Sequence, residues 1–554
     1  MKFSEMPYNR VDIDAVIKKL DSLIKEQNNA NSKEEAISIH KKYYDLMIEE
    51  QTNITLCNVR NAIDTQDPFY EKEQAFYDEN LPKFYKKNVE YQESLVNSKF
   101  KNDIEEFIGS VAIKNIELAM KSTSNDILEL QKEENLLITK YEKLIASAKI
   151  DWEGEVLNLS LMKKYQSSKD REIRRKAYNK VTEFFVENEE ELDDIYDKLV
   201  KNRTKQAKIL GYDNFVELGY NRMFRNSYRR EEVEKFRKQI IEEFVPYTLK
   251  LHEKRRKNLE VDKLSYVDEG IYYKNGNPEP NAKPDEILEK GRQMYSKMHH
   301  KTKEFMNFMM ENELFDVYGR KTKRAGGFMT YFHKYKSPFV FANFNGTHGD
   351  IDVITHECGH AFQGYLSGKD PILEHSDIGM ETAEIHSMSM EFFTYKYMED
   401  FFGSRSEDYL KMHFDDACIF IPYGTMVDHF QHIVYENPEL TPKQRKEEWR
   451  KLEKIYKPYL HYENNEYMEQ GGFWQKQLHI YCMPFYYIDY VLAQVCAIQY
   501  KIWLDKNYDE AFESYIKLCE LSAKDFYPNL LKEVGLKVPF KDGVIKEIIN
   551  ELEK

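Results

Sequence analysis

Hydrophobic residues recur every three to four positions along most of the chain, with charged residues between them. That spacing gathers the apolar side chains on one face of an α-helix. Segments with this pattern include residues 11–25, 81–96, 104–120, 127–150 and 231–251. Polar breaks of the kind found in turns between antiparallel helices lie at residues 28–32, 97–99 and 122–125. The pattern predicts a mostly α-helical fold.

The pattern changes between residues 261 and 347, where glycines, prolines and aromatic residues cluster. Residues 325–332 and 338–344 form short aromatic runs with Gly or Pro at their start, which is typical of β-strands. We therefore expect a small sheet directly before residue 350, after which the helical pattern returns. Two interpretations of residues 341–347 stay open: an edge strand that lies beside an extended peptide, or a buried structural strand.

Composition and charge narrow the class of protein. The chain has 554 residues, a length that suits two to four domains or one large helical body, and its 41% hydrophobic and 32% charged residues are typical of a folded protein. Its net charge of −15 argues against nucleic acid or an anionic membrane surface as a partner, because both attract basic proteins. A mean hydropathy of −0.72 and the lack of any apolar run of about 18 residues exclude a membrane-spanning helix. Since the start of the chain is acidic where a signal peptide would be apolar, we expect a cytoplasmic protein.

The most informative segment is His356-Glu357-Cys358-Gly359-His360, an H-E-x-x-H pattern. On a helix the two histidines lie about 40° apart around the axis, so both imidazoles can ligate one tetrahedral zinc ion. Glu357 lies about 60° from His360 and can reach a water molecule at the metal without being a ligand. An amphipathic helix with surface histidines is the alternative interpretation. The motif favours a zinc hydrolase with Glu357 as its general base.

A catalytic zinc site needs a third protein ligand and an open fourth position. The next acidic segment, residues 379–392, offers three glutamates on one helical stripe, while its histidine projects from another face. Those glutamates are Glu381, Glu384 and Glu391. Spacing alone leaves both Glu381 and Glu384 open as the third ligand.

These two motifs together resemble those of the M3 family of zinc oligoendopeptidases. The likeness is greatest to the oligoendopeptidase F and Pz-peptidase branch, which is related to thimet oligopeptidase and neurolysin. It also includes residues 325–328 and 342–347, and covers residues 200–554. The resemblance implies one Zn²⁺ per chain, held by His356, His360 and Glu384, with Glu381 and Glu391 as supporting carboxylates. One departure is Cys358, where many relatives carry Phe or Leu.

The resemblance also implies residues that stabilise the oxyanion of the tetrahedral intermediate. Carried over residue by residue, these are His479, Tyr486 and Tyr490, and the two tyrosines share a helical face at i and i+4. Longer-chain relatives have a Gly-rich segment between the histidine and the tyrosines, whereas this chain has Cys482-Met483-Pro484. Which of Tyr486, Tyr487 and Tyr490 meets the oxyanion therefore stays open, and an aromatic core helix is the other interpretation of this segment.

We therefore expect a mostly α, two-lobed metallopeptidase of the gluzincin type, with a small sheet beside the zinc-binding helix and a deep substrate channel. Residues 1–165 would form a helical scaffold lobe and residues 166–554 the catalytic domain. The resemblance implies a zinc-dependent endopeptidase that hydrolyses internal bonds of short, unstructured peptides. The alternatives are a peptidyl-dipeptidase, which releases C-terminal dipeptides, and a non-catalytic peptide-binding helical protein. The sequence does not indicate an oligomeric state.

Overall fold

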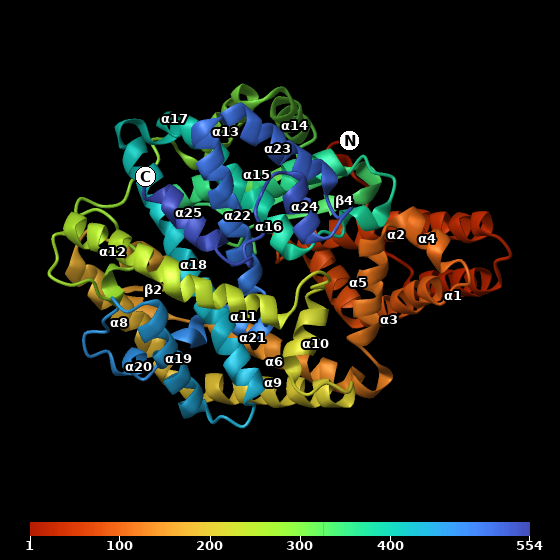
Figure 1. Cartoon of the computed structure of the whole chain (residues 1–554), viewed down its shortest axis with the longest axis horizontal. Coiled ribbons are helices and arrows are strands. Elements are labelled where there is room, and N and C mark those ends of the chain that lie inside the picture. The colour runs from red at the N-terminus through yellow and green to blue at the C-terminus, as the bar shows by residue number, and fades with distance from the viewer. Residues whose placement is uncertain (325) are drawn as a thin grey trace. The chain divides into compact units, whose positions relative to one another are not determined.

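Helices dominate the computed structural model, which describes residues 1–324 and 326–554 (Figure 1). The prediction of a mostly α fold is confirmed. Ala325, part of the predicted strand at residues 325–332, lies outside the described residues. The chain forms two compact units, and the predicted division at residue 165 stays a prediction. The first unit comprises Met1–Met120, Glu279–Ser406 and Cys496–Leu536, and the second comprises Lys121–Pro278, Glu407–Val495 and Lys537–Lys554.

Five amphipathic helices open the first unit, of which α1, α2 and α3 pack on one another (Figure 1). The predicted helix over residues 104–120 is two helices, because Gly109 takes a φ of +92° and ends the first of them. The apolar faces meet in a common core that includes Leu20, Met47 and Tyr91. The five helices are α1 (Ile13–Asn29), α2 (Lys33–Ile63), α3 (Pro68–Val96), α4 (Lys101–Ile108) and α5 (Ser110–Lys121).

The predicted small sheet is present in the first unit, with the strand order β3-β5-β4. Its strands are β3 (Phe315–Tyr318), β4 (Phe328–Phe332) and β5 (Ser337–Phe344). The central strand β5 runs parallel to β3 and antiparallel to β4. The edge-strand interpretation of residues 341–347 is therefore wrong, since β5 is buried and has a hydrogen-bonded neighbour on each side.

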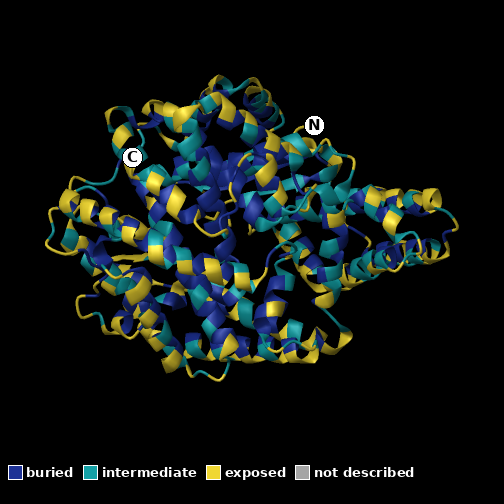
Figure 2. Cartoon of the chain, in the orientation of Figure 1, coloured by how far each residue is buried: buried dark blue, intermediate teal, exposed yellow. Residues whose placement is uncertain are grey.

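Helix α15 (His348–Ser367) occupies the centre of the first unit. It packs on β4 and β5, which confirms the prediction of a sheet beside the H-E-x-x-H helix. Helices α13, α14, α16 and α23 also contact it, and Figure 2 shows α15 mostly in the colour of buried residues. The other helices of this unit are α13 (Pro284–Met298), α14 (His300–Glu311), α16 (Met380–Phe393), α17 (Glu399–Phe402), α23 (Tyr508–Leu521) and α24 (Tyr527–Glu533).

The second unit contains a hairpin that the sequence pattern did not predict. The expected helix over residues 127–150 ends at Ala146, and β1 (Ile150–Trp152) then pairs with β2 (Glu155–Leu157). Glu153 and Gly154 between the strands both have positive φ, which suits the tight turn of a two-residue hairpin loop. A periodicity of three to four cannot reveal strands as short as these.

The remaining helices build most of the second unit. The predicted helix over residues 231–251 is interrupted by a π-helical turn at Ile240–Phe244, just before Pro246, which has no N–H to continue the α-helical ladder. The helices are α6 (Leu128–Ala146), α7 (Leu159–Gln166), α8 (Arg171–Glu187), α9 (Glu189–Ile209), α10 (Phe215–Arg222), α11 (Arg230–Gln239), α12 (Val245–Leu259), α18 (Ser406–Glu436), α19 (Pro442–Tyr456), α20 (Glu466–Glu469), α21 (Leu478–Cys482), α22 (Tyr487–Lys506) and α25 (Val544–Leu552). Helix α22 begins in this unit and continues into the first.

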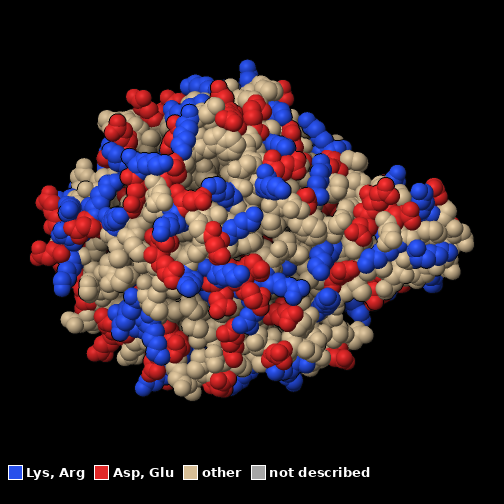
Figure 3. Space-filling view, viewed as in Figure 1, with Lys and Arg blue, Asp and Glu red and all other residues tan. Residues whose placement is uncertain are grey.

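The surface is mixed in charge on the face that Figure 3 shows. Basic and acidic side chains are interspersed there, and no continuous basic stripe of the kind that binds nucleic acid is seen on that face. Among the described residues, no helix is both long enough and apolar enough to cross a lipid bilayer.

Candidate active site

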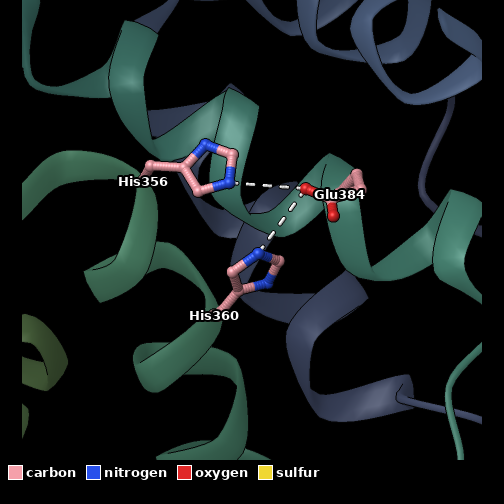
Figure 4. Close-up of side chains that lie close together, drawn as sticks. All are labelled: His356, His360 and Glu384. Carbon is pink, nitrogen blue, oxygen red and sulfur yellow. Dashed lines mark ion pairs between the residues drawn. The ribbon is translucent and has the colours of Figure 1, made fainter. Parts of the chain in front are cut away.

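The three predicted metal ligands come together in the first unit. His356 and His360 lie one turn apart on α15, and Glu384 projects from α16 between their imidazoles (Figure 4). The Glu384 Oε2 atom is 3.4 Å from His356 Nε2 and 3.5 Å from His360 Nε2. Two donors on one tetrahedral zinc, with bonds of about 2.1 Å, are separated by about 3.4 Å. The separation of Glu384 from each histidine therefore fits a shared zinc ion, and all three donor atoms lie within 4.8 Å of one another.

Packing distinguishes the two glutamates that spacing left open. Among the described residues, the only His, Cys, Asp and Glu side chains grouped closely enough to hold a metal are His356, His360 and Glu384. The Glu381 carboxylate instead turns back toward Gly379, where a Cβ atom would lie 2.8 Å from Glu381 Oε1. The structure thus places Glu384, and not Glu381, beside the imidazoles.

Gly359, inside the H-E-x-x-H motif, allows α15 and α16 to approach closely. A Cβ atom at this position would lie 2.6 Å from both the His386 carbonyl oxygen and the Ser387 Cα, closer than real Cβ atoms come. The hydroxyl of Tyr515, on α23, donates to the same His386 carbonyl at 2.8 Å. The close contact brings the Glu384 carboxylate within reach of both histidines, so a side chain at residue 359 would push α16 away.

Two neighbours orient the ligand side chains. His356 Nδ1 donates to Glu391 Oε1 at 2.6 Å, which leaves Nε2 as the nitrogen that can bind a metal. Glu391 thus contacts one of the two histidines, and its implied role as a supporting carboxylate stays a prediction. The Ser387 hydroxyl donates to Glu384 Oε2 at 3.0 Å. Sequence reasoning missed Ser387, although its spacing of i+3 from Glu384 on a helix was a usable signal.

Burial and neighbouring charges set the ionisation of the two key carboxylates. Burial raises the pKa of Glu384, but hydrogen bonds to His356 and His360 outweigh it and hold that pKa well below its ordinary range. Glu384 is therefore ionised, the form in which a carboxylate can bind a metal ion. Burial also raises the pKa of Glu357, and the nearby imidazoles only partly oppose this effect. A carboxylate with a raised pKa is a better proton acceptor, which suits a general base.

Glu357 itself is buried and lies beside the sheet. A Cβ atom at Gly327, just before β4, would be 3.6 Å from Glu357 Oε1. The Glu357 carboxylate is not among the three side chains grouped at the metal position. Its neighbour Cys358 is fully buried in the core and takes no part in the group.

The second unit holds the other predicted residues, His479, Tyr486 and Tyr490. His479 lies on α21, Tyr486 directly precedes α22, and Tyr490 lies in the first turn of α22. The ring centroids are 5.5 Å apart for His479 and Tyr486, and 4.6 Å apart for the two tyrosines. Tyr487 also lies within 5.0 Å of His479, measured between ring centroids. We refer to these four residues as the ring cluster.

Two residues orient the imidazole of His479. Sequence reasoning did not identify either of them. The Tyr423 hydroxyl donates to Gln477 Oε1 at 2.8 Å, and Gln477 Nε2 donates to His479 Nδ1 at 3.3 Å. Since Gln477 occupies Nδ1, the Nε2 atom of His479 is left to carry a proton. A histidine in this tautomer can donate a hydrogen bond.

Comparisons with known proteins agree with these features and confirm the resemblance seen in the sequence. A family model described as peptidase family M3 matches residues 164–548, and one described as the peptidase M3 N-terminal domain matches residues 3–123. An oligoendopeptidase F homolog from Borreliella burgdorferi is 22% identical over 475 residues, which cover 81% of this chain and 78% of that protein.

Solved structures extend the likeness over the whole chain. A crystal structure of an oligoendopeptidase F is 42% identical, with a TM-score of 0.94, and the match covers 100% of this chain and 98% of that one. Pz peptidase A with an inhibitor is 43% identical, with the same TM-score and the same coverage. An oligoendopeptidase F from Bacillus anthracis is 40% identical, with a TM-score of 0.90 and coverage of 100% and 97%. With its H-E-x-x-H helix and the facing glutamate, the chain belongs to peptidase family M3 and is an enzyme of the metallo-oligopeptidase type.

Proposed function

We propose that the chain is a zinc-dependent endopeptidase that cleaves internal bonds of short, unstructured peptides. The observation that carries this proposal is the spacing of the donor atoms of His356, His360 and Glu384, which matches the ligand separation of one tetrahedral zinc. The names of the similar proteins, which include oligoendopeptidase F and a Pz peptidase with an inhibitor, support peptides as the substrate class.

Each ligand side chain has a defined task in this proposal. His356 and His360 would bind the ion through Nε2, and Glu384 through its carboxylate. Glu391 keeps the proton of His356 on Nδ1, and Ser387 fixes the Glu384 carboxylate. A zinc ion held there would supply a Lewis acid that polarises the scissile carbonyl and makes a neighbouring water molecule more acidic.

Glu357 and the ring cluster would move protons and stabilise charge. The Glu357 carboxylate takes a proton from the attacking water and passes it to the nitrogen of the leaving amine. Its raised pKa favours holding that proton between the two steps. His479, Tyr486 and Tyr490 offer N–H and O–H donors for the oxyanion that develops on the scissile carbonyl.

A matched pair of ten-residue peptides distinguishes the endopeptidase from the peptidyl-dipeptidase. One peptide ends in a free carboxylate and the other in an amide, and mass spectrometry identifies the products of each. An endopeptidase should cut both at the same internal bond with similar kcat/KM, because it needs no contact with the C-terminus. Release of a C-terminal dipeptide from the free acid alone would overturn the endopeptidase assignment. Glu357→Gln, purified in parallel, controls for contaminating peptidases.

Zinc dependence needs a separate experiment. A chelator should abolish cleavage of the ten-residue peptide, and one equivalent of zinc per chain should restore it. Metal removal is verified by elemental mass spectrometry, and activity that persists after it would rule out the zinc mechanism.

The preference for short peptides is tested in the same assay. A reduced and denatured globular protein should be cut far more slowly than the ten-residue peptide.

A further inference from the structure

The turn at residues 483–486, which joins α21 to α22, contains a residue in an unfavourable backbone conformation. Phe485 has a φ of +70°, in the left-handed region that residues with a Cβ atom seldom adopt. Such a conformation persists only where the surrounding structure holds it, and conformations of this kind cluster at functional sites. The turn lies between His479 and Tyr486, so its shape decides how the ring cluster is assembled.

Four rings enclose the side chain of Phe485, which is fully buried. Their centroids lie between 5.1 and 6.2 Å from that of Phe485. We call these four residues the aromatic socket: Phe215, Tyr220, His432 and Tyr435. Gly219 on α10 completes it, because a Cβ atom there would lie 2.6 Å from Phe485 Cδ2. The ring can therefore occupy this position only if residue 219 is a glycine. Any larger residue there would force the ring to move.

Polar contacts hold the backbone on both sides of the Phe485 ring. The Phe485 N–H donates to Gln431 Oε1 at 3.0 Å, and the Arg225 guanidinium donates to the Phe485 carbonyl oxygen. The same Arg225 nitrogen also donates to Asp489 Oδ1 at 3.1 Å. Arg225 and Asp489 are both buried, and the Tyr228 hydroxyl donates to Asp489 at 2.9 Å. One guanidinium thus ties the turn to the first turn of α22.

We propose that Phe485 and Arg225 are positioning residues, which hold the turn so that Tyr486 and Tyr490 present their hydroxyls to the substrate oxyanion. This inference rests on the proposed role of the two tyrosines. Tyr486 directly follows the anchored Phe485, and Tyr490 directly follows the anchored Asp489. A misplacement of about 1 Å at the reacting centre can lower the rate by about 100-fold, so a small shift of the turn is costly.

A simpler account would be that residue 485 only needs to adopt a positive φ. Glycine would meet that need without strain, since it has no Cβ atom. The chain instead uses the residue that fills the aromatic socket and accepts the strained conformation. The positive φ sets the shape of the turn, and the Phe485 ring in the aromatic socket fixes its position.

Phe485→Gly separates these two accounts, because it tolerates the φ of +70° and removes the ring. If the ring positions the tyrosines, kcat for the ten-residue peptide should fall by about 10-fold or more, while KM changes by less than about 3-fold. Zinc content should stay at one per chain. Wild-type kcat in this variant would overturn the proposal, provided that Tyr486→Phe or Tyr490→Phe lowers kcat in the same assay.

Gly219→Ala tests the same idea without touching the turn. Alanine favours a helix more than glycine does, but its Cβ atom must displace the Phe485 ring. We expect the fall in kcat to resemble that of Phe485→Gly, and unchanged kcat would count against the proposal. Gly291→Ala is the matched control: it also adds a Cβ atom to a helix, with its nearest neighbour at an ordinary 3.6 Å, and should keep wild-type kcat. If Phe485→Gly does not fold, the comparison of Gly219→Ala with Gly291→Ala decides whether the ring positions the turn.

Combined variants show whether Phe485 acts through the tyrosines. The two tyrosines are first replaced together by phenylalanine, and Phe485→Gly is then added to that variant. If Phe485 acts only by positioning them, the triple variant should be no slower than the double variant. Losses that multiply would mean a general structural role and would overturn the proposal. Normal kcat in the double variant itself would instead show that the oxyanion role of the tyrosines is wrong, and the positioning role with it.

Discussion

The metal-ligand group of the first unit and the ring cluster of the second unit differ in how the sequence encodes them. The metal-ligand group comprises His356, His360 and Glu384. It depends on a single helical turn, which sets the two histidines on one face, and on the contact between α15 and α16 at Gly359. The ring cluster depends on a turn whose shape is held by Gln431 and Arg225, which are 54 and 260 positions away from Phe485.

This difference shows where spacing in a sequence is informative. A group that forms within one turn of helix leaves a fixed interval between its residues, and the interval can be read directly. A group that forms around a loop leaves no such interval, because its supports come from distant helices. The same difference predicts how each site fails: the metal group by losing its ion, and the ring cluster by losing rate with the ion still bound.

The largest effect should come from removing the third ligand. Glu384→Ala leaves two histidines for the metal, so we expect zinc affinity to fall by more than ~100-fold and activity to fall with it. Glu381→Ala is the matched control on the same helix, since its carboxylate turns away toward Gly379, and it should keep most of its metal. Zinc content and kcat/KM are measured for both variants. Metal loss in Glu381→Ala with metal retained in Glu384→Ala would reverse the ligand assignment.

The next effect lies in the ring cluster. Tyr486→Phe and Tyr490→Phe each remove one hydroxyl and keep the ring, so whichever tyrosine contacts the oxyanion should lose ~10²–10³ in kcat. KM should change less, because the contact is made mainly in the transition state, and zinc content should not change. Steady-state kinetics on the ten-residue peptide give both constants. If both variants behave as wild type, Tyr486 and Tyr490 belong to the core and neither of them stabilises the oxyanion.

A smaller effect is expected at the hydrogen bond that orients His356. Glu391→Ala leaves His356 Nδ1 without its carboxylate, and we expect a loss of ~10- to 100-fold in zinc affinity. Glu391→Gln can still accept the hydrogen bond through its amide oxygen and should lose less. A competition titration with a zinc indicator ranks the two variants against wild type. Equal affinity in all three would mean that Glu391 does not support the ligand.

The smallest effect on turnover should come from Glu134, which helps to hold α21 and therefore His479. Its carboxylate pairs with Arg203 at 2.6 Å, and Arg203 also donates to the Tyr481 carbonyl on α21. Burial raises the pKa of Glu134, but Arg203 and Arg222 outweigh it and lower that pKa from 4.5 to about 2. A pKa that is lower in the folded than in the unfolded chain stabilises the fold above pH 4.5, and this contribution is lost as the pH falls toward 2.

Glu134→Gln should therefore lower the free energy of unfolding by roughly 3 kcal/mol near pH 7, and by less as the pH falls below 4.5. Urea unfolding of the full-length chain, followed at several pH values in both proteins, measures this difference. A difference that stays constant between pH 7 and pH 2 would mean that the carboxylate charge contributes nothing. Turnover at pH 7 should change little, because Glu134 reaches α21 through Arg203 and the Tyr481 carbonyl, at one remove from the His479 side chain.

Much of the helical fold could be predicted from periodicity, and its interruptions could not. Hydrophobic spacing continues across Gly109, although the backbone there turns to a positive φ and ends α4. The hairpin of β1 and β2 is too short to carry a pattern. These features depend on the conformation of single residues and on local pairing, and a count of apolar positions is insensitive to both.

The residues of the candidate site likewise divide into those that the sequence predicts and those that it does not. The two histidines and Glu357 follow from one motif, but spacing alone left Glu381 and Glu384 equivalent. In the folded chain Glu384 lies with the two histidines, whereas the Glu381 carboxylate turns toward Gly379. Ser387 and Gln477 were missed because their roles depend on which neighbour each side chain reaches in the folded chain. The supports of the turn at Phe485 were missed for the same reason.

The central claim is that the first unit holds zinc through three ligands and that Glu357 acts beside the metal without binding it. The most direct test is to measure zinc content and kcat on one preparation of Glu357→Gln. The account predicts one zinc per chain, as in wild type, and a loss of at least ~10² in kcat, because the substitution removes the base and leaves every ligand in place. Stoichiometric loss of zinc, or turnover close to that of wild type, would contradict it.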